Sequence, residues 1–97
     1  MTKVLFVCTG NTCRSPMAEA LFNDYAKQIG LDAEASSAGV FCLTSSPVSE
    51  HSVAVMAELE LDISGHMSRQ VSEEILADAD IVLANTKRAL NRAWALL

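Results

Sequence analysis

The sequence predicts an α/β fold, a three-layer sandwich in which helices cover both faces of a doubly wound parallel sheet. Two observations support this prediction: continuous apolar segments alternate with amphipathic ones, and no repeat, low-complexity tract or linker interrupts them. Strands buried on both faces read as unbroken apolar runs, whereas covering helices show apolar residues every three or four positions. Their alternation implies right-handed crossovers and a ligand site at the carboxyl ends of the strands.

The first half of the chain supplies two predicted strands and a long helix between them. Residues 4–7, Val-Leu-Phe-Val, form an unbroken apolar strand, and residues 33–38 form a weaker one. Apolar residues at helical spacing lie between these strands, and Gly30 is placed to end the helix. The helix face predicted to be buried consists of Met17, Leu21, Phe22, Tyr25, Ala26 and Ile29. Tyr25 is therefore expected in the core or at its edge, and residues 41–48 are expected to form a loop along a cleft.

The second half of the chain supplies the remaining predicted elements. A helix over residues 49–59 is followed by a short helix that Ser72 caps, and then by a strand over residues 81–84. Asn85 or Thr86 is expected to start the last helix. The apolar residues predicted to be buried in the two longer helices are Val53, Met56, Leu59, Leu90, Trp94 and Leu97. The positive residues assigned to the solvated side of the last helix are Lys87, Arg88 and Arg92.

Length and composition limit what the protein does. The 97 residues fit a single domain over 1–97, and a hydrophobic content of 51% is enough for a buried core. No apolar run approaches the ~20 residues of a membrane span, and the amino-terminal residues lack the pattern of a secretory signal. The net charge of −5 argues against general nucleic-acid binding. The sequence therefore predicts a cytoplasmic protein without a membrane or nucleic-acid partner.

The cysteine pattern predicts thiols, not a metal centre. The three cysteines are an odd number without the spacing of zinc ligands, so no metal and no cofactor is expected. In a reducing compartment they should remain thiols, and Cys42 is interpreted as incidental.

The most informative segment is the turn between the first strand and the first helix. The strand runs directly into Cys8, and Arg14 follows after five intervening residues, with Ser15 and Pro16 opening the helix. A helix N-terminus leaves about four N–H groups unpaired and carries roughly half a positive charge, so it attracts oxyanions. The guanidinium of Arg14 matches two oxygens of such an anion. The same field favours the thiolate form of Cys8, which is the nucleophilic form.

The residues inside this loop fit the same interpretation. Residues 9–13 can curl into a nest of N–H groups, since Gly10 allows close approach or a positive φ and Asn11 tolerates left-handed geometry. The hydroxyl of Ser15 is placed to hydrogen-bond the sulfur and also to cap the helix. The alternative interpretation of Cys8 is a small buried hydrophobe at a strand end. The strand before it and the Gly, Asn and Ser-Pro after it favour an anion-binding nucleophile.

Four segments of the chain carry a resemblance to a known family. They are 7–20 (Val-Cys-Thr-Gly-Asn-Thr-Cys-Arg-Ser-Pro-Met-Ala-Glu-Ala), 37–39 (Ser-Ala-Gly), His66 with 69–71 (Arg-Gln-Val), and 79–83 (Ala-Asp-Ile-Val-Leu). On these residues the chain resembles the low-molecular-weight protein tyrosine phosphatase family from residue 3 onward. The resemblance implies the strand order 2-1-3-4, with the fourth strand and the last helix missing.

The resemblance implies a two-step hydrolysis through a phosphocysteine. Cys8 is implied to attack phosphorus, water then releases phosphate, and Arg14 and Ser15 complete the catalytic group. The residues implied to bind phosphate are Thr9, Gly10, Asn11, Thr12, Cys13 and Arg14. The implied partners are a phosphorylated protein substrate and phosphate or a similar oxyanion. Since Cys8 and Cys13 share one loop, a reversible disulfide between them can protect the nucleophile, and some family members pair these positions.

A further set of residues is implied to hold the phosphate loop in shape. In the family, a strained loop Asn is held by two Ser residues and a His. The matching positions are Asn11, Ser15, Ser37 and His66. The alternative for His66 is an exposed loop histidine that follows Gly65.

Two positions bear on the substrate. Members that resemble bacterial protein-arginine phosphatases carry Thr at the position of Thr12, where tyrosine-specific members carry an aliphatic residue. That branch also tends to read Ser-Ala-Gly-Val-Phe, as residues 37–41 do. Thr12 and Phe41 are therefore assigned to the substrate side, and phosphoarginine is favoured over phosphotyrosine. The alternatives are ordinary drift at Thr12 and a buried core ring at Phe41.

The chain departs from the family pattern at its carboxyl end. It contains no Asp-Pro dipeptide, which in the family supplies the general acid. Asp78 and Asp80 precede the third strand and so belong at the opposite end of the sheet, and Asp62 leads into a loop. No general acid is found, and the chain is interpreted as a domain truncated relative to the family. An uncovered sheet edge or face then predicts a homodimer.

Three functions are compatible with this sequence. The first is a protein phosphatase that acts on phosphoarginine or phosphotyrosine and is weakened by the lack of the acid. The second is a non-catalytic phosphate- or phosphoprotein-binding fragment that self-associates. The third is an arsenate reductase, which is disfavoured because residues 81–97 contain none of the additional cysteines that such chemistry uses.

Overall fold

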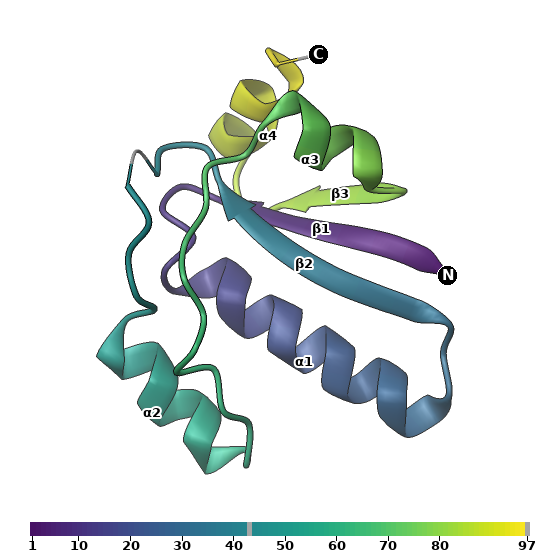
Figure 1. Cartoon of the computed structure of the whole chain (residues 1–97), viewed down its shortest axis with the longest axis vertical. Helices are drawn as coiled ribbons and strands as arrows, with labels where there is room; N and C mark the ends of the chain where they lie inside the picture. The colour runs from purple at the N-terminus through teal and green to yellow at the C-terminus, as the bar shows by residue number, and fades with distance from the viewer. Residues whose placement is uncertain (43, 97) are drawn as a thin grey trace.

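Three parallel strands form a sheet in the order β2-β1-β3 in the computed structural model, which describes residues 1–42 and 44–96. The elements follow one another as β1 (Thr2–Cys8), α1 (Arg14–Ile29), β2 (Ala33–Gly39), α2 (Glu50–Glu58), α3 (Glu73–Asp78), β3 (Ile81–Ala84) and α4 (Lys87–Trp94). Helices α1 and α2 lie on one side of the sheet, and α3 and α4 lie on the other (Figure 1). The predicted α/β fold with a parallel doubly wound sheet is confirmed.

The central strand β1 brings the candidate nucleophile to the carboxyl end of the sheet. β1 pairs in parallel with β2 and with β3, and its last residue, Cys8, stands opposite Gly39, the last residue of β2. Leu5 and Val7 are buried in this strand. Three strand ends therefore meet where the first loop begins, as expected for a ligand site of a parallel sheet.

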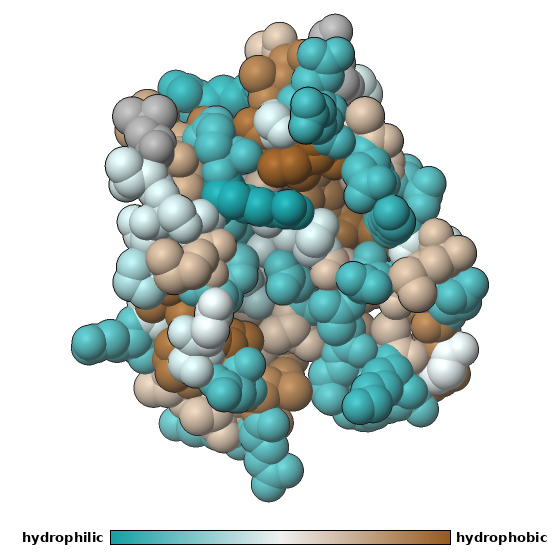
Figure 2. All heavy atoms as spheres, viewed as in Figure 1, coloured by the Kyte–Doolittle hydropathy of each residue, from teal (hydrophilic) through white to brown (hydrophobic). Residues whose placement is uncertain are grey.

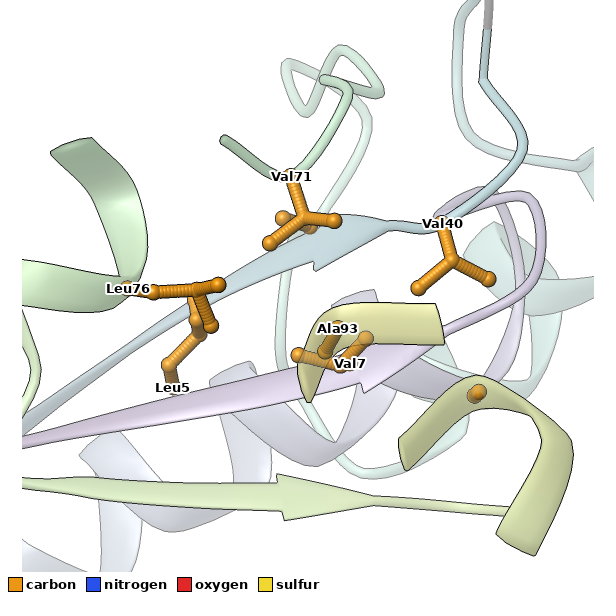
Figure 3. Packing of buried hydrophobic residues seen from close by; sticks show 8 residues of the cluster. Leu5, Val7, Val40, Val71, Leu76 and Ala93 are labelled. Atoms are coloured by element: carbon orange, nitrogen blue, oxygen red, sulfur yellow. The ribbon is translucent and has the colours of Figure 1, made fainter. Parts of the chain in front are cut away.

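Two apolar clusters hold the layers together. The larger one lies between the sheet and the helices α3 and α4, and its buried residues are Leu5, Val7, Ala38, Val40, Val71, Leu76, Ala89 and Ala93. Figure 3 shows Leu76 of α3 pointing toward Leu5 of β1, and Ala93 of α4 lying over Val7. The smaller cluster joins α2 to α1 through Val48, Met56 and Ile63. Each cluster fixes one side of the first loop, because β1 leads into the loop and α1 leads out of it.

The predicted helix faces are correct in part. In α1, Ala26 is buried and Phe22 meets Phe6 edge-on with ring centroids 6.1 Å apart, but Tyr25 is 61% exposed. The predicted core position of Tyr25 is therefore wrong, as are those of Leu21 and Ile29, which are also exposed. The reason is that α1 lies mainly over β2, so its apolar stripe is wider than the surface it meets.

The last helix buries small residues instead of large ones. Ala89 and Ala93 contact the core, whereas Trp94 is exposed and Leu90 is only half-buried, so the predicted Leu90–Trp94 face is wrong. Alanine faces the sheet because a helix close to the strands leaves no room for larger side chains. Leu97, also predicted on that face, lies outside the described residues. In α2, Met56 is buried as predicted, but Leu59 is exposed at the helix end.

Three predicted helix ends agree with the structure. Gly30 takes the left-handed conformation with φ of 68° after α1, and the side chains of Ser72 and Thr86 accept the capping hydrogen bonds of α3 and α4. Most of the surface in Figure 2 is polar, with apolar atoms gathered over α3 and α4 and over α2. Of the helices in residues 1–42 and 44–96, none has the length and apolar character needed to cross a membrane.

Candidate active site

The sulfur of Cys8 lies buried at the end of β1 and accepts hydrogen bonds from the loop that follows. Asn11 N donates to Cys8 Sγ at 3.1 Å, and Ser15 Oγ lies 2.8 Å from the same sulfur. Ser15 belongs to the first turn of α1. The loop therefore folds back over the thiol. Asn11 in the middle of the loop and Ser15 just after its end both contact the sulfur.

The direction of these hydrogen bonds follows from counting protons. Arg69 N donates to Asn11 Oδ1 at 3.0 Å, which leaves the other end of the amide, Nδ2, to donate to Ser15 Oγ at 2.8 Å. A hydroxyl has one proton. Since Ser15 Oγ accepts from Asn11, its own proton is free to point at Cys8 Sγ. The sulfur thus accepts two hydrogen bonds, one from a main-chain N–H and one from a hydroxyl.

Asn11 is the strained residue of the loop. It is fully buried and takes a left-handed φ of 57°, a conformation that asparagine tolerates better than most residues. His66 Nε2 lies 3.3 Å from the carbonyl oxygen of Asn11, and Arg69 N holds its side chain. The structure therefore brings His66 and Ser15 to Asn11, as the resemblance implied.

Ser37 does not hold Asn11 directly, contrary to what the resemblance implied. Its hydroxyl donates to Glu19 Oε1 at 2.7 Å, and its carbonyl oxygen accepts from Arg69 Nε at 2.9 Å. The carboxylate of Glu19 is a stronger acceptor than an amide. Ser37 acts on the loop through Arg69, whose main chain was not predicted to contact Asn11. The motif that contains Arg69 was the only signal in the sequence for this contact.

Two carbonyl groups of the loop accept hydrogen bonds from the segment that follows β2. Thr9 O accepts from Phe41 N, and Thr12 O accepts from Ser49 N, each at 2.8 Å. Within the described part of the chain, no acceptor is found for the N–H groups of Gly10, Thr12, Cys13 and Arg14. The loop thus keeps N–H donors without an acceptor, as expected of an anion-binding nest.

The N-terminus of α1 adds to this nest. Its N-cap is Cys13, which makes no side-chain capping hydrogen bond, so the predicted cap at Ser15 is wrong. Ser15 lies inside the helix, and its hydroxyl is already used by Asn11 and Cys8. The first N–H groups of α1 are left for a ligand. All three cysteines are free thiols, and Cys13 Sγ accepts from Ser52 Oγ at 3.2 Å.

Gly39, not Gly10, is the glycine that the loop requires. Gly10 does not take a positive φ, and a Cβ there would make an ordinary contact of 3.7 Å with Thr12 Oγ1. A Cβ on Gly39 would lie 2.7 Å from Thr9 O. The close approach of backbone that the structure contains is therefore at Gly39, across the strand ends, where β2 supports the loop from behind. A close approach of an anion to Gly10 stays a prediction.

Two hollows adjoin the loop. The first, of about 240 Å³, is lined by Cys8, Arg14 and Ser15 together with residues of the β3 end such as Leu83 and Asn85. The second, of about 270 Å³, is lined by Thr9, Val40, Phe41, Arg88 and Arg92.

The two residues predicted on the substrate side fall in different places. Phe41 is 60% exposed and lines the second hollow, so it is not the buried core ring of the alternative interpretation. Thr12 is half-buried near the start of α2 and lines neither hollow.

The acidic residues considered as general acids lie elsewhere. Lys3 Nζ pairs with Asp78 at 3.1 Å, and Lys3 N donates to Asp80, at the amino end of the sheet. Asp62 accepts hydrogen bonds from the hydroxyl and the N–H of Ser64, and these lower the pKa of its carboxyl below the usual value. A lowered pKa opposes proton donation near neutral pH. Among residues 1–42 and 44–96, no Asp or Glu lines either hollow, and no group of three potential ligands is placed to hold a metal ion.

The comparisons with known proteins agree with this geometry. The family model for low molecular weight phosphotyrosine protein phosphatase matches residues 3–96. A protein-arginine-phosphatase of Bacillus subtilis is 46% identical over 83 residues, covering 86% of this chain and 55% of the relative. A low molecular weight protein-tyrosine-phosphatase of the same organism is 42% identical over 87 residues, covering 87% and 56%. The chain thus spans a little more than half the length of these curated relatives.

Solved structures place the chain in the same group. A low molecular weight protein tyrosine phosphatase from T. tengcongensis superposes with a TM-score of 0.92 at 47% identity, covering 98% of this chain and 65% of that one. An arginine phosphatase mutant with serine for cysteine and a phosphorylated active-site serine superposes with a TM-score of 0.89 at 40% identity, covering 97% and 61%. By sequence and by structure, the chain belongs to the low molecular weight phosphotyrosine protein phosphatase family.

Proposed function

We propose that this chain acts as a Cys-dependent protein phosphatase of the cytoplasm, with Cys8 as nucleophile. The observation that carries the proposal is that Cys8 Sγ accepts two hydrogen bonds at the start of a loop in which several N–H groups have no acceptor among the described residues. That a related arginine phosphatase becomes phosphorylated at its active-site serine, in a mutant with serine for cysteine, supports a covalent phosphoenzyme.

The reaction has two displacements at phosphorus. Cys8 Sγ forms a bond to phosphorus as the bond from phosphorus to the leaving group breaks, which gives a phosphocysteine. Water oxygen then attacks phosphorus, the S–P bond breaks, and the thiolate is restored. Arg14 and the loop N–H groups hold the three remaining oxygens throughout. In the second step, the donors from Asn11 N and Ser15 Oγ stabilise the sulfur as it leaves.

We further propose that the described residues supply the nucleophile and the phosphate loop but not the acid. The hollow beside Cys8 is lined by Arg14 and Ser15 and by no carboxylate within the described part of the chain. Loss of a general acid slows a reaction about 10²–10⁴-fold, and most strongly when the leaving group is basic.

A leaving-group comparison tests this proposal. The 97-residue chain is expected to hydrolyse p-nitrophenyl phosphate, whose leaving group needs little protonation, but to be about 10²–10⁴-fold poorer on phenyl phosphate. The measurement is kcat/KM for both esters, in this chain and in a version extended with a family-type segment that carries the Asp-Pro loop. In the extended version the difference in kcat/KM between the two esters should disappear. Asp→Asn in its Asp-Pro loop should restore that difference. No hydrolysis of either ester by either chain would overturn the proposed function.

For the substrate we propose phosphoarginine ahead of phosphotyrosine in proteins. The support is the presence of Thr12 in the phosphate loop, together with the name of one relative: the protein-arginine-phosphatase of Bacillus subtilis is 46% identical. A relative named as a tyrosine phosphatase is 42% identical, so phosphotyrosine is the alternative substrate. A threonine hydroxyl can hydrogen-bond a guanidinium leaving group, whereas an aliphatic side chain cannot.

Thr12→Ile is expected to shift the preference toward phosphotyrosine by about tenfold, because a site that loses its hydrogen bond discriminates less well. The measurement is phosphate release from two peptides that differ only in the phosphorylated residue. Thr2→Ile, the same change at an exposed threonine at the amino end of β1, serves as the control and should leave the ratio unchanged. An unchanged ratio in Thr12→Ile would show that Thr12 does not select the substrate.

A non-catalytic binding fragment is the second candidate. Ile81 and Leu83 are exposed on β3, which lies at one edge of the sheet, and such apolar side chains favour self-association. Phosphate binding without turnover in both the short and the extended chain would favour this candidate over the phosphatase.

A further inference from the structure

Two arginines of α4 lie beside the phosphate loop and have no role in the reaction described above. Arg88 and Arg92 are four residues apart, so they share one face of the helix, and both are exposed. They line the hollow of about 270 Å³ together with Thr9, Val40 and Phe41. Thr9 directly follows Cys8. The hollow therefore adjoins the phosphate site without including the sulfur.

The charges of this hollow are not neutralised by nearby residues. The chain carries a net charge of −5, yet α4 contains Lys87, Arg88 and Arg92 and no acidic residue. Within residues 1–42 and 44–96, the ion pairs are those of Met1 with Asp32 and Lys3 with Asp78, which lie at the amino end of the sheet. The arginine pair thus presents positive charge to a ligand in an otherwise acidic protein.

Helix stability does not account for the position of Arg88. A positive side chain is favourable in the last turn of a helix and unfavourable in the first, because of the helix dipole. Arg92 lies in the last turn of α4 and gains from this effect, but Arg88 is the second residue of the helix. Arg88, like Lys87 before it, therefore opposes the dipole, so helix stability does not explain its charge; unlike Lys87, it lines the hollow.

Phe41 supplies the apolar wall of the same hollow. Its ring is 60% exposed, and its N–H donates to Thr9 O at 2.8 Å, so the base of the side chain is fixed relative to the phosphate loop. A hollow with an aromatic wall and two guanidinium groups suits an anionic side chain with an apolar stem.

We propose that Arg88, Arg92 and Phe41 form a subsite for an acidic side chain that lies next to the phosphorylated residue of a protein substrate. The inference rests on the proposed function, because the phosphorylated residue must occupy the loop above Cys8. An extended peptide advances about 3.3 Å per residue, so a neighbouring side chain reaches a hollow that adjoins the loop. A carboxylate and a second phosphate both match the guanidinium fork, and the experiment separates these two sources.

The test measures peptide binding to the Cys8→Ala form of the full chain, which has no nucleophile at this position and so holds substrates without reacting with them. Fluorescent phosphotyrosine and phosphoarginine peptides carry Glu, Gln or phosphoserine on both sides of the phosphorylated residue. The Glu peptides are expected to bind about 3- to 10-fold more tightly than the Gln peptides, and less so at high salt. In the double variant Arg88→Gln/Arg92→Gln this ratio should fall to about one. Lys87→Gln, a neighbour on α4 that does not line the hollow, should preserve it.

Each outcome decides the proposal. A gain confined to the phosphoserine peptides would identify a second phosphate as the occupant of the same subsite. The subsite would be overturned if Glu and Gln peptides bound equally, or if Lys87→Gln lowered the Glu-to-Gln ratio as much as the double variant does. The proposed function would stand in either case if inorganic phosphate still binds. Absence of both phosphate binding and Cys8-dependent turnover would overturn the proposed function, and the subsite with it.

Discussion

Cys8→Ser is expected to abolish hydrolysis of p-nitrophenyl phosphate, with a loss on the order of 10⁴-fold or more in kcat. A serine hydroxyl is a weaker nucleophile than a thiolate, and a serine alkoxide is a poorer leaving group, so even a serine that becomes phosphorylated, as in the related arginine phosphatase, should not sustain turnover. The ring of His66 contacts the carbonyl oxygen of Asn11, not the nucleophile. The phosphate loop remains, so inorganic phosphate should still bind. The measurements are steady-state kinetics and a phosphate titration.

Cys42→Ser is the matched control for this prediction. Cys42 is also buried and free, but its sulfur donates to Ser68 Oγ at 3.0 Å, away from the phosphate loop. The same substitution there should leave kcat within about twofold, since surface and satellite changes rarely disturb a distant site. If Cys8→Ser retained turnover similar to that of Cys42→Ser, the nucleophile would have to be another group.

The sequence predicted the fold well where local pattern determines structure. The strand over residues 81–84 agrees with β3, and the caps at Ser72 and Thr86 were found because capping depends on residues adjacent in sequence. The buried faces of α1 and α4 were predicted less well. Tyr25 and Trp94 are large and apolar, but which side of a helix meets the sheet depends on spacing between layers, which periodicity alone does not contain.

The candidate site shows the same division between local and non-local information. Cys8, Asn11 and Ser15 lie within eight residues. The hydrogen bond of Ser15 with Cys8 was predicted from the loop pattern, and that of Asn11 with Ser15 was implied by the family resemblance. The hydrogen bond from Asn11 N to Cys8 Sγ was not predicted. The contact of Arg69 N with Asn11 spans 58 residues and is made by the main chain of Arg69, so the side chains in the sequence do not predict it. The motif around Arg69 was the only signal. The partner of Ser37, Glu19, was missed for the same reason, because it depends on how α1 lies against β2.

Gly39→Ala is expected to lower both stability and activity, although the site contains no side chain at this position. The new Cβ would lie 2.7 Å from Thr9 O and 3.0 Å from Gly10 C, and both contacts are with backbone of the phosphate loop. Gly39 cannot move away, because its N–H donates to Arg69 O at 2.8 Å and its carbonyl accepts from Val71 N at 2.7 Å. Overpacking of this kind costs about 1–3 kcal/mol in the free energy of unfolding.

The loop must therefore shift away from β2, and this displaces its N–H groups from the position of the phosphate oxygens. A displacement of about 1 Å lowers turnover by roughly 10²-fold, so kcat/KM for p-nitrophenyl phosphate should fall by that amount together with phosphate affinity. Gly65→Ala is the matched control, since no atom lies within 4 Å of its Cβ position and its φ is not left-handed. It should change the free energy of unfolding by no more than about 0.5 kcal/mol. If Gly39→Ala matched Gly65→Ala in melting temperature and in kcat/KM, the close approach of β2 to the loop would not be what shapes the anion site.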